Sequence, residues 1–330
     1  MRKTVLALLK IGLSAAIIVW LVWDALNDDP EALSSLRYGR KDWGLLVLAG
    51  LSCSTAIFIC YIRWWLLVRA LGLPAQFRDT LRIGMIGYLF NLAPMGIVGG
   101  DLLKAWLLSR EQGGHPAQAL ASVGVDRAVG MCSLFIVASL GILASGLWRH
   151  EAINVICLAT LATTVVGLGF SAALLAPDFT GGAIGRLLRQ LPYLGTPVTR
   201  LMSAVRMYRQ HQGVLLAALL LSFAVHSFFV TGIHLISRAL PGPTMSYGEH
   251  FVVAPLAAVT SAIPLPAGPQ EGAMKYLYGE LASAGLKGLV ITLVYRIITL
   301  LVAAVGTGYY FASRREVAEV LHEHEGEDRE

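Results

Sequence analysis

One short segment combines helix-breaking residues with a carboxylate and a lysine, which together could bind an ionic group. Residues 91–104 read NLAPMGIVGGDLLK, with Asp101 three positions before Lys104. Proline removes a backbone donor and glycine loosens the backbone, so we expect a hinge rather than one continuous helix. The predicted hinge residues are Pro94, Gly96, Gly99 and Gly100. In a hydrophobic chain, a broken helix carrying charges is a candidate site, because freed backbone groups must be buried in protein or face water.

A second segment repeats this pattern about half a chain later. Residues 261–275 read SAIPLPAGPQEGAMK, with Glu271 four positions before Lys275. Each acid follows a proline by seven positions. The second set of hinge residues is Pro264, Pro266 and Gly268. Two interrupted segments at corresponding places in two halves indicate a transporter binding site.

An arginine follows each acid by about 25 residues, within an apolar run. These are Arg127 after Asp101 and Arg296 after Glu271. An arginine at membrane depth is costly unless it is paired or hydrated, and it forms bidentate contacts with carboxylates and phosphates. Two interpretations stay open: internal ion pairs within each half, or arginines that receive a lipid phosphate. We hypothesise that all four residues line one cavity near a pseudo-symmetry axis.

Simpler roles exist for the same side chains. Asp101 and Glu271 could cap the helices that they begin, because a helix N-terminus carries free N–H groups and positive partial charge. Asp126 adjoins Arg127 but points about 100° away on a helix, and Lys104 is a possible partner for it. Further candidate polar lining comprises Asn91, Gln270 and Tyr295. His226 and His234 are expected to be buried and hydrogen-bonded rather than to form a proton relay.

Composition indicates an all-α polytopic membrane protein. The chain has 330 residues, of which 56% are hydrophobic and 14% charged, against roughly 25% charged in soluble proteins. Apolar runs of spanning length recur. The net charge of +5 suits topology and anionic lipid headgroups better than nucleic acid. Four cysteines without a CxxC pair are expected to be free thiols, and no spacing indicates a catalytic triad, a cofactor or a metal site.

The run of hydrophobic segments predicts six full spans and two broken elements, in a single membrane domain at 1–312 with a charged tail at 313–330. The broken elements are either re-entrant or pairs of short spans. Pseudo-repeat elements are predicted at about 81–147 and 248–312, in inverted orientation. An amphipathic cytoplasmic segment is expected at about 180–212. Lysine and arginine are more abundant in the segments assigned to the inside, which places both termini in the cytoplasm and the protein in the cell membrane.

The ordered motifs resemble the flippase-like family that includes the transmembrane region of lysylphosphatidylglycerol synthase. The resemblance covers nearly the whole chain. The family pattern is a Pro/Gly-rich turn with an acid and a following base, then V-x-x-[DE]-R-x-x-G, then a late P-x-x-x-G-x-x-E segment. The matching positions are Pro94, Gly99, Gly100, Asp101, Lys104, Asp126, Arg127, Gly130, Pro264, Gly268 and Glu271. The chain departs at Lys104, where the family often has Arg, and at Pro269-Gln270.

The resemblance implies movement of a phosphate-bearing lipid, aminoacylated or of the polyprenyl type, between membrane leaflets. The candidate substrate-binding residues are Asp101, Lys104, Asp126, Arg127, Gln270, Glu271, Lys275 and Arg296. The alternatives are an intramembrane lipid-modifying transferase, with Asp101 or Glu271 as general base, and an accessory protein of envelope-lipid biosynthesis. No enzyme constellation is present in the sequence, which favours the transporter. The identity of the lipid, the energy coupling and the oligomeric state are not readable from it.

Overall fold

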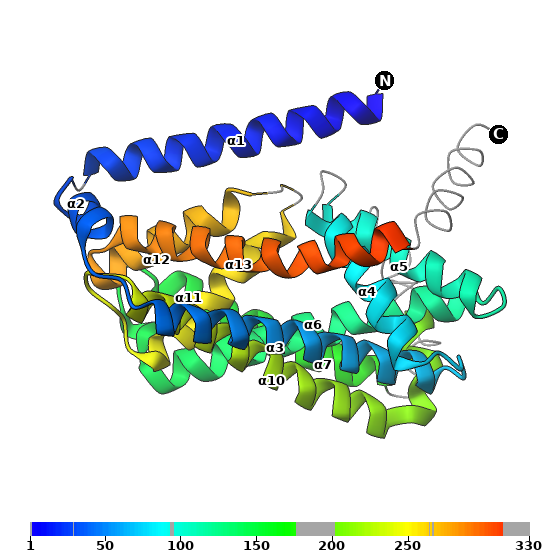
Figure 1. The fold of residues 1–330 in the computed structure, drawn as a ribbon. Helices are drawn as coiled ribbons and strands as arrows, with labels where there is room; N and C mark the ends of the chain where they lie inside the picture. Colours follow the sequence, from blue (N-terminus) through cyan, green and yellow to red (C-terminus); the bar gives the residue numbers. More distant parts are fainter. Residues whose placement is uncertain are drawn as a thin grey trace.

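The computed structural model describes residues 2–28, 30–92, 96–175, 202–263, 265 and 267–312, and every regular element among them is helical. The helices are α1 (Arg2–Asp28), α2 (Pro30–Tyr38), α3 (Trp43–Ala70), α4 (Phe77–Leu92), α5 (Gly96–Glu111), α6 (Pro116–Ser145), η1 (Leu147–Arg149), α7 (Asn154–Leu175), η2 (Arg209–His211), α10 (Gln212–Ala239), α11 (Tyr247–Val259), η3 (Thr260–Ala262), α12 (Pro269–Ala282) and α13 (Gly285–Ala312). Figure 1 shows the long helices lying roughly parallel or antiparallel to one another. The predicted fold class, an all-α polytopic membrane protein, is confirmed.

Five of these helices are long and apolar enough to cross a membrane: α3, α6, α7, α10 and α13. The sixth predicted span falls in α1, whose described apolar stretch is Gly12–Asp24. The predicted amphipathic segment lies mostly outside the described residues, as does the charged tail at 313–330. Hinge residues Pro94, Pro264 and Pro266 also lie outside them.

Local sequence signals explain where several helices begin and end. Asp42 caps α3 by accepting a hydrogen bond from the backbone N–H of Leu45 at 3.1 Å. Proline occupies the first position of α6, where its missing N–H costs nothing. The same helix stops at Gly146, whose φ of 71° is the left-handed conformation that glycine adopts readily. Ser246 and Glu249 form a reciprocal capping box at the start of α11.

Helix α3 is longer than the sequence indicated. We expected a span ending near Ile62, followed by a basic loop, but the helix continues to Ala70. Arg63, which the topology count placed in that loop, is only 5% exposed and lies inside the bundle. The prediction was wrong because an acid from another helix neutralises this arginine, so its charge does not mark a membrane boundary.

Two sets of four helices make matching contacts. In the first set, α3, α4, α5 and α6, the helix pairs α4–α5, α5–α6, α3–α4 and α3–α6 pack together. In the second set, α10, α11, α12 and α13, the corresponding pairs also pack together. The sets join through α3 against α10, through α4 against α13 and through α11 against α6. Figure 1 shows α3 and α10 running in opposite directions, with the α4–α5 hairpin towards one end of the bundle and the α11–α12 hairpin towards the other.

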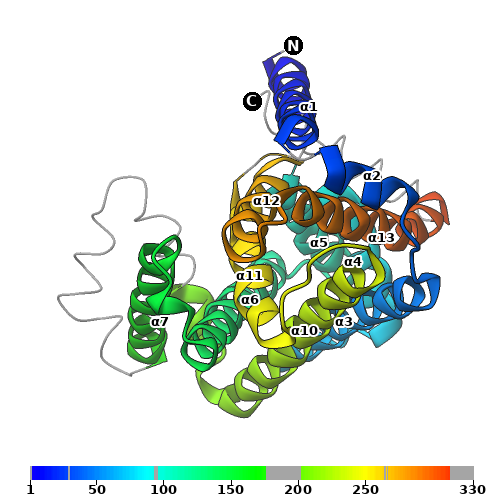
Figure 2. The same ribbon diagram turned by 90° about the vertical axis from the view of Figure 1, so that its left-hand side faces the viewer.

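The remaining helices lie at the periphery. Helix α7 packs on α6, and α1 contacts α12 and α13. Figure 2 shows α1 and α7 at separate edges of the bundle. The predicted broken elements thus correspond to the two helical hairpins, each held by one complete four-helix set.

Candidate functional site

The two arms of the first hairpin cross at glycines. A Cβ atom at Gly100 would lie 2.3 Å from the carbonyl oxygen of Gly87, and one at Gly87 would lie 2.4 Å from Cγ of Lys104. Only glycine permits so close an approach of α4 and α5. Gly96, Gly99 and Gly100 all lie within α5, so in this structure they form helix rather than a bend; their role as hinges stays a prediction.

Asp101 of α5 lies between two cations. The guanidinium of Arg127 on α6 grips it with a fork, donating from Nε to Oδ2 at 2.6 Å and from Nη2 to Oδ1 at 2.8 Å. Nζ of Lys104, one turn along α5, lies 3.6 Å from Oδ1 of the same carboxylate. Asp101 and Lys104 are each 14% exposed at their side chains, whereas Arg127 is 47% exposed. The predicted pairing of Asp101 with Arg127 is therefore present, and it leaves one face of the arginine accessible.

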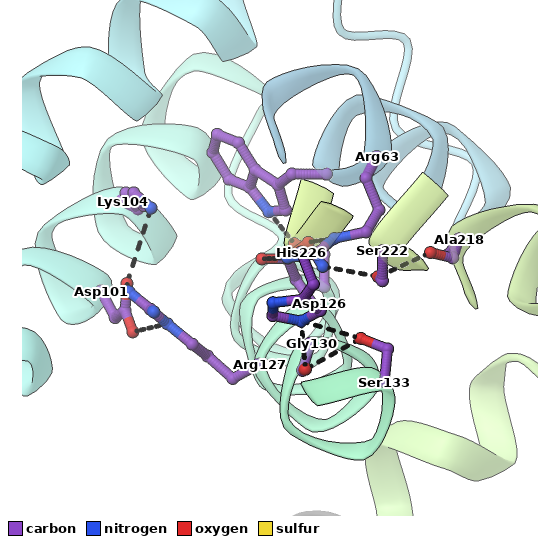
Figure 3. A network of polar contacts seen from close by, with 12 residues as sticks. Arg63, Asp101, Lys104, Asp126, Arg127, Gly130, Ser133, Ala218, Ser222 and His226 are labelled. Atoms are coloured by element: carbon purple, nitrogen blue, oxygen red, sulfur yellow. Dashed lines mark hydrogen bonds and ion pairs between the residues drawn. The ribbon is translucent and has the colours of Figure 1, made fainter. Parts of the chain in front are cut away.

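The neighbouring Asp126 belongs to a different, more buried network. Figure 3 shows Arg127 and Asp126 extending from α6 in different directions, towards α5 and towards α3. Asp126 accepts two hydrogen bonds from Arg63, at 2.8 and 3.0 Å, and Nη1 of Arg63 donates to Oγ of Ser222 on α10 at 2.6 Å. The suggested pairing of Asp126 with Lys104 was wrong, because Arg63 takes both carboxylate oxygens.

The same network includes His226, as the sequence suggested for a buried histidine. Its Nε2 lies 3.1 Å from the carbonyl oxygen of Gly130 and 3.1 Å from Oγ of Ser133. Gly130 also makes room for Arg63, since a Cβ atom there would lie 3.3 Å from Nη1 of that arginine. This network, centred on Arg63, fastens α3, α6 and α10 together beside the Asp101 pair.

The second hairpin presents a corresponding pair in a closed setting. Glu271 of α12 is fully buried, and its Oε1 accepts from Nε of Arg296 on α13 at 2.5 Å. Its Oε2 accepts from the backbone N–H of Gly268 at 2.8 Å. Gly268 has a φ of 111° and has no side chain to return the bond, so only half of a capping box forms. Glu271 thus combines the two roles considered for it, the helix cap and the ion pair.

The other predicted site residues lie around this second pair. Lys275 forms an ion pair with Asp24 of α1, and Gln270 accepts a hydrogen bond from Ser261 at 3.3 Å. Tyr295 packs edge-on against Phe229 of α10. The structure therefore brings the predicted residues together in two groups, one in each four-helix set. A shared cavity between the two groups stays a prediction.

Arg63 is the site residue that sequence reasoning missed. It lies at the end of an apolar run and was interpreted as a topological signal, whereas its partner Asp126 lies 63 positions away. A useful signal was available: Asp126 follows Gly124 and precedes Arg127 within a spanning run, so an acid pointing away from Arg127 needs a second cation.

The fold and the site together define a multi-pass membrane protein with two interrupted hairpins, each bearing a carboxylate bound to an arginine. The family comparison agrees with this class. The family described as the lysylphosphatidylglycerol synthase TM region matches residues 7–306, and the chain belongs to that family. No curated protein matches the chain.

Proposed function

We propose that the protein moves a phosphate-bearing lipid between the leaflets of the cell membrane. The observation that carries the proposal is the presence of two helical hairpins at opposite ends of the bundle, each holding an acid–arginine pair at a corresponding position. Interrupted helices from two inverted halves form the substrate sites of many transporters. Membership of a family associated with a phospholipid synthase supports a lipid as the substrate.

The lengths of the hairpin arms support re-entrant elements rather than pairs of short spans. Helices α4 and α5 have 16 residues each, and α11 and α12 have 13 and 14. At 1.5 Å per residue the longest arm reaches about 24 Å, short of the roughly 30 Å hydrocarbon core. In the proposed topology α1 is the sixth span, both termini are cytoplasmic and the hairpins enter from opposite sides.

Cysteine labelling tests this topology. Cysteines at His150 and His115, both exposed, would be introduced after replacement of the four native cysteines. A membrane-impermeant maleimide on intact cells should label position 150 and not position 115. Labelling of position 115 from outside would contradict the cytoplasmic placement of the α5–α6 turn.

Arg127 is the proposed phosphate ligand. It stands 11 residues into α6, roughly 16 Å along the helix axis, and half of its side chain is exposed there. A guanidinium exposed at that depth needs water or an anion beside it, because burying a bare charge in hydrocarbon is costly. The forked N–H groups of arginine bind phosphate as well as carboxylate.

Reconstitution into liposomes tests the function. Purified protein with fluorescently labelled phospholipids should exchange lipid between leaflets without ATP, as measured by accessibility of the label to an impermeant quencher. Arg127→Ala should lower the rate at least about tenfold, equivalent to one charge-assisted hydrogen bond. Arg149→Ala, which removes an exposed arginine stacked on Trp148, is the matched control and should leave the rate unchanged. A new lipid product on thin-layer chromatography would instead support the transferase.

A further inference from the structure

The charges around Asp101 do not balance. Among the described residues, Asp101 contacts two cations, Arg127 at 2.6 Å and Lys104 at 3.6 Å, while the adjacent Arg63–Asp126 pair is neutral by itself. The group therefore carries one excess positive charge. A ligand that completes it would bring one net negative charge.

Asp101 also occupies the hydrogen-bonding edge of Arg127 that an anionic ligand would use. Both of its oxygens lie on the guanidinium, in the parallel two-bond arrangement that a phosphate adopts with arginine. Because Lys104 lies on the same helix, one turn away, it can hold the Asp101 carboxylate if Arg127 is lost. The carboxylate has a second partner already in place.

We propose that Asp101 is an internal substitute for the headgroup: a lipid phosphate displaces it from Arg127, Asp101 stays with Lys104, and the site prefers headgroups with net negative charge. This inference rests on the proposed function. It implies that an empty carrier keeps its arginine neutralised, which lowers the cost of an unoccupied charged site in the membrane.

The second hairpin lacks the features that displacement requires. Both oxygens of Glu271 are engaged, by Arg296 and by the Gly268 N–H, and the residue is fully buried. Its nearest lysine in sequence, Lys275, is paired with Asp24 instead. Glu271 is therefore expected to remain in place throughout the transport cycle, which makes it a matched comparison for Asp101.

A lipid-binding measurement on the full chain in detergent tests the proposal. Dioctanoyl phosphatidylglycerol should bind Asp101→Asn about tenfold more tightly than wild type, since the internal competitor is gone. Dioctanoyl phosphatidylcholine, which is net neutral, should gain less than threefold. Glu271→Gln and Asp126→Asn remove the same charge, from carboxylates that do not hold Arg127, and should each change the affinity less than threefold. Unchanged or weaker phosphatidylglycerol binding by Asp101→Asn, or equal tightening in the controls, would overturn the proposal.

Inorganic phosphate distinguishes a lipid site from a site for the free anion. Millimolar phosphate that displaces the lipid from Asp101→Asn supports phosphate chemistry at Arg127, and tighter binding of lipid than of phosphate assigns the lipid as the ligand. Phosphate bound as tightly as lipid contradicts the lipid assignment.

A second variant covers the case in which Asp101→Asn does not fold. Lys104→Met leaves the Asp101–Arg127 pair intact but removes the alternative partner, so phosphatidylglycerol should bind about tenfold more weakly, and Lys104→Arg should restore binding. Equal binding by Lys104→Met and wild type would exclude displacement. Failure of wild type to exchange lipid in liposomes counts against the proposed function, whereas these binding comparisons decide the role of Asp101 separately.

Discussion

The two acid–arginine pairs share a position in their halves but differ in their surroundings. Glu271 follows Asp101 by 170 residues and Arg296 follows Arg127 by 169, and each arginine stands 11 residues into its helix. In the first pair the acid is 14% and the arginine 47% exposed; in the second the values are 0% and 25%. One local chemistry is thus found in an open setting and in a closed one.

Helix α1 accounts for part of this difference. Near the second hairpin, a Cβ atom at Gly268 would lie 2.7 Å from a methyl carbon of Ile17, and Ser14 accepts a hydrogen bond from the N–H of Ala267. The Lys275–Asp24 ion pair joins the same two elements. Coverage by α1 and capping by Glu271 make the second pair a structural element, whereas packing leaves the first pair available to a ligand. Sequence position alone does not assign these roles.

The largest expected effect is on the closed pair. Glu271→Ala leaves Arg296 without its carboxylate in a buried setting and removes the helix cap, so it should destabilise the fold by about 3–5 kcal/mol. Asp101→Ala should cost less than half as much, because Arg127 is half exposed and can be hydrated. Unfolding of the two variants in detergent, followed by circular dichroism, makes the comparison. Equal losses would remove the distinction between the two settings.

The buried Arg63–Asp126 pair has no counterpart at the same spacing in the second half, where positions 232 and 295 are Gly and Tyr. Arg63→Met alone should destabilise by about 3 kcal/mol, since Asp126 is left buried and unpaired. The double change Arg63→Met with Asp126→Leu should recover most of that loss, because an apolar pair replaces the charges. Additive losses in the double variant would show that the network contributes more than mutual neutralisation.

Gly268 gives a third, smaller test. Alanine at this position would be strained by the φ of 111° and would meet Ile17, so Gly268→Ala should cost about 1–3 kcal/mol. Gly124→Ala is the matched control, because it lies within α6 and a Cβ atom there would meet nothing within 4 Å. That change should stabilise by about 0.5–1 kcal/mol. A denaturation midpoint for Gly268→Ala at or above that of wild type would contradict the close contact with α1.

The smallest effect concerns the attachment of α1. Lys275→Met should destabilise by about 0.2–1 kcal/mol, the range of partly exposed ion pairs. Asp24→Asn should give the same loss, and the double variant no more than either single change, when thermal midpoints are compared. Independent, additive losses would mean that the two residues contribute separately rather than as a pair.

The sequence predicted the local parts of this arrangement well. Proline and glycine spacing located both hairpins, and the interval of about 25 residues from acid to arginine identified both ion pairs, because each involves neighbouring helices. Arg63, the coverage by α1 and the close crossing at Gly87 were not predicted. They depend on which helices pack together, and hydropathy carries no information on that. The difference in exposure between the two pairs also arises only from packing.

The packing of α3 against α10 has a consequence for biogenesis. The two helices are separated by more than 140 residues, so during synthesis α3 enters the membrane well before its main packing partner exists. Arg63 would then wait for Ser222, but its other partner, Asp126, belongs to the earlier half of the chain. The first four-helix set can therefore neutralise its buried arginine by itself and await the second set as a stable intermediate. Loss of Asp126 is expected to harm membrane insertion before it harms the finished protein, because domains assemble in the order in which they are made.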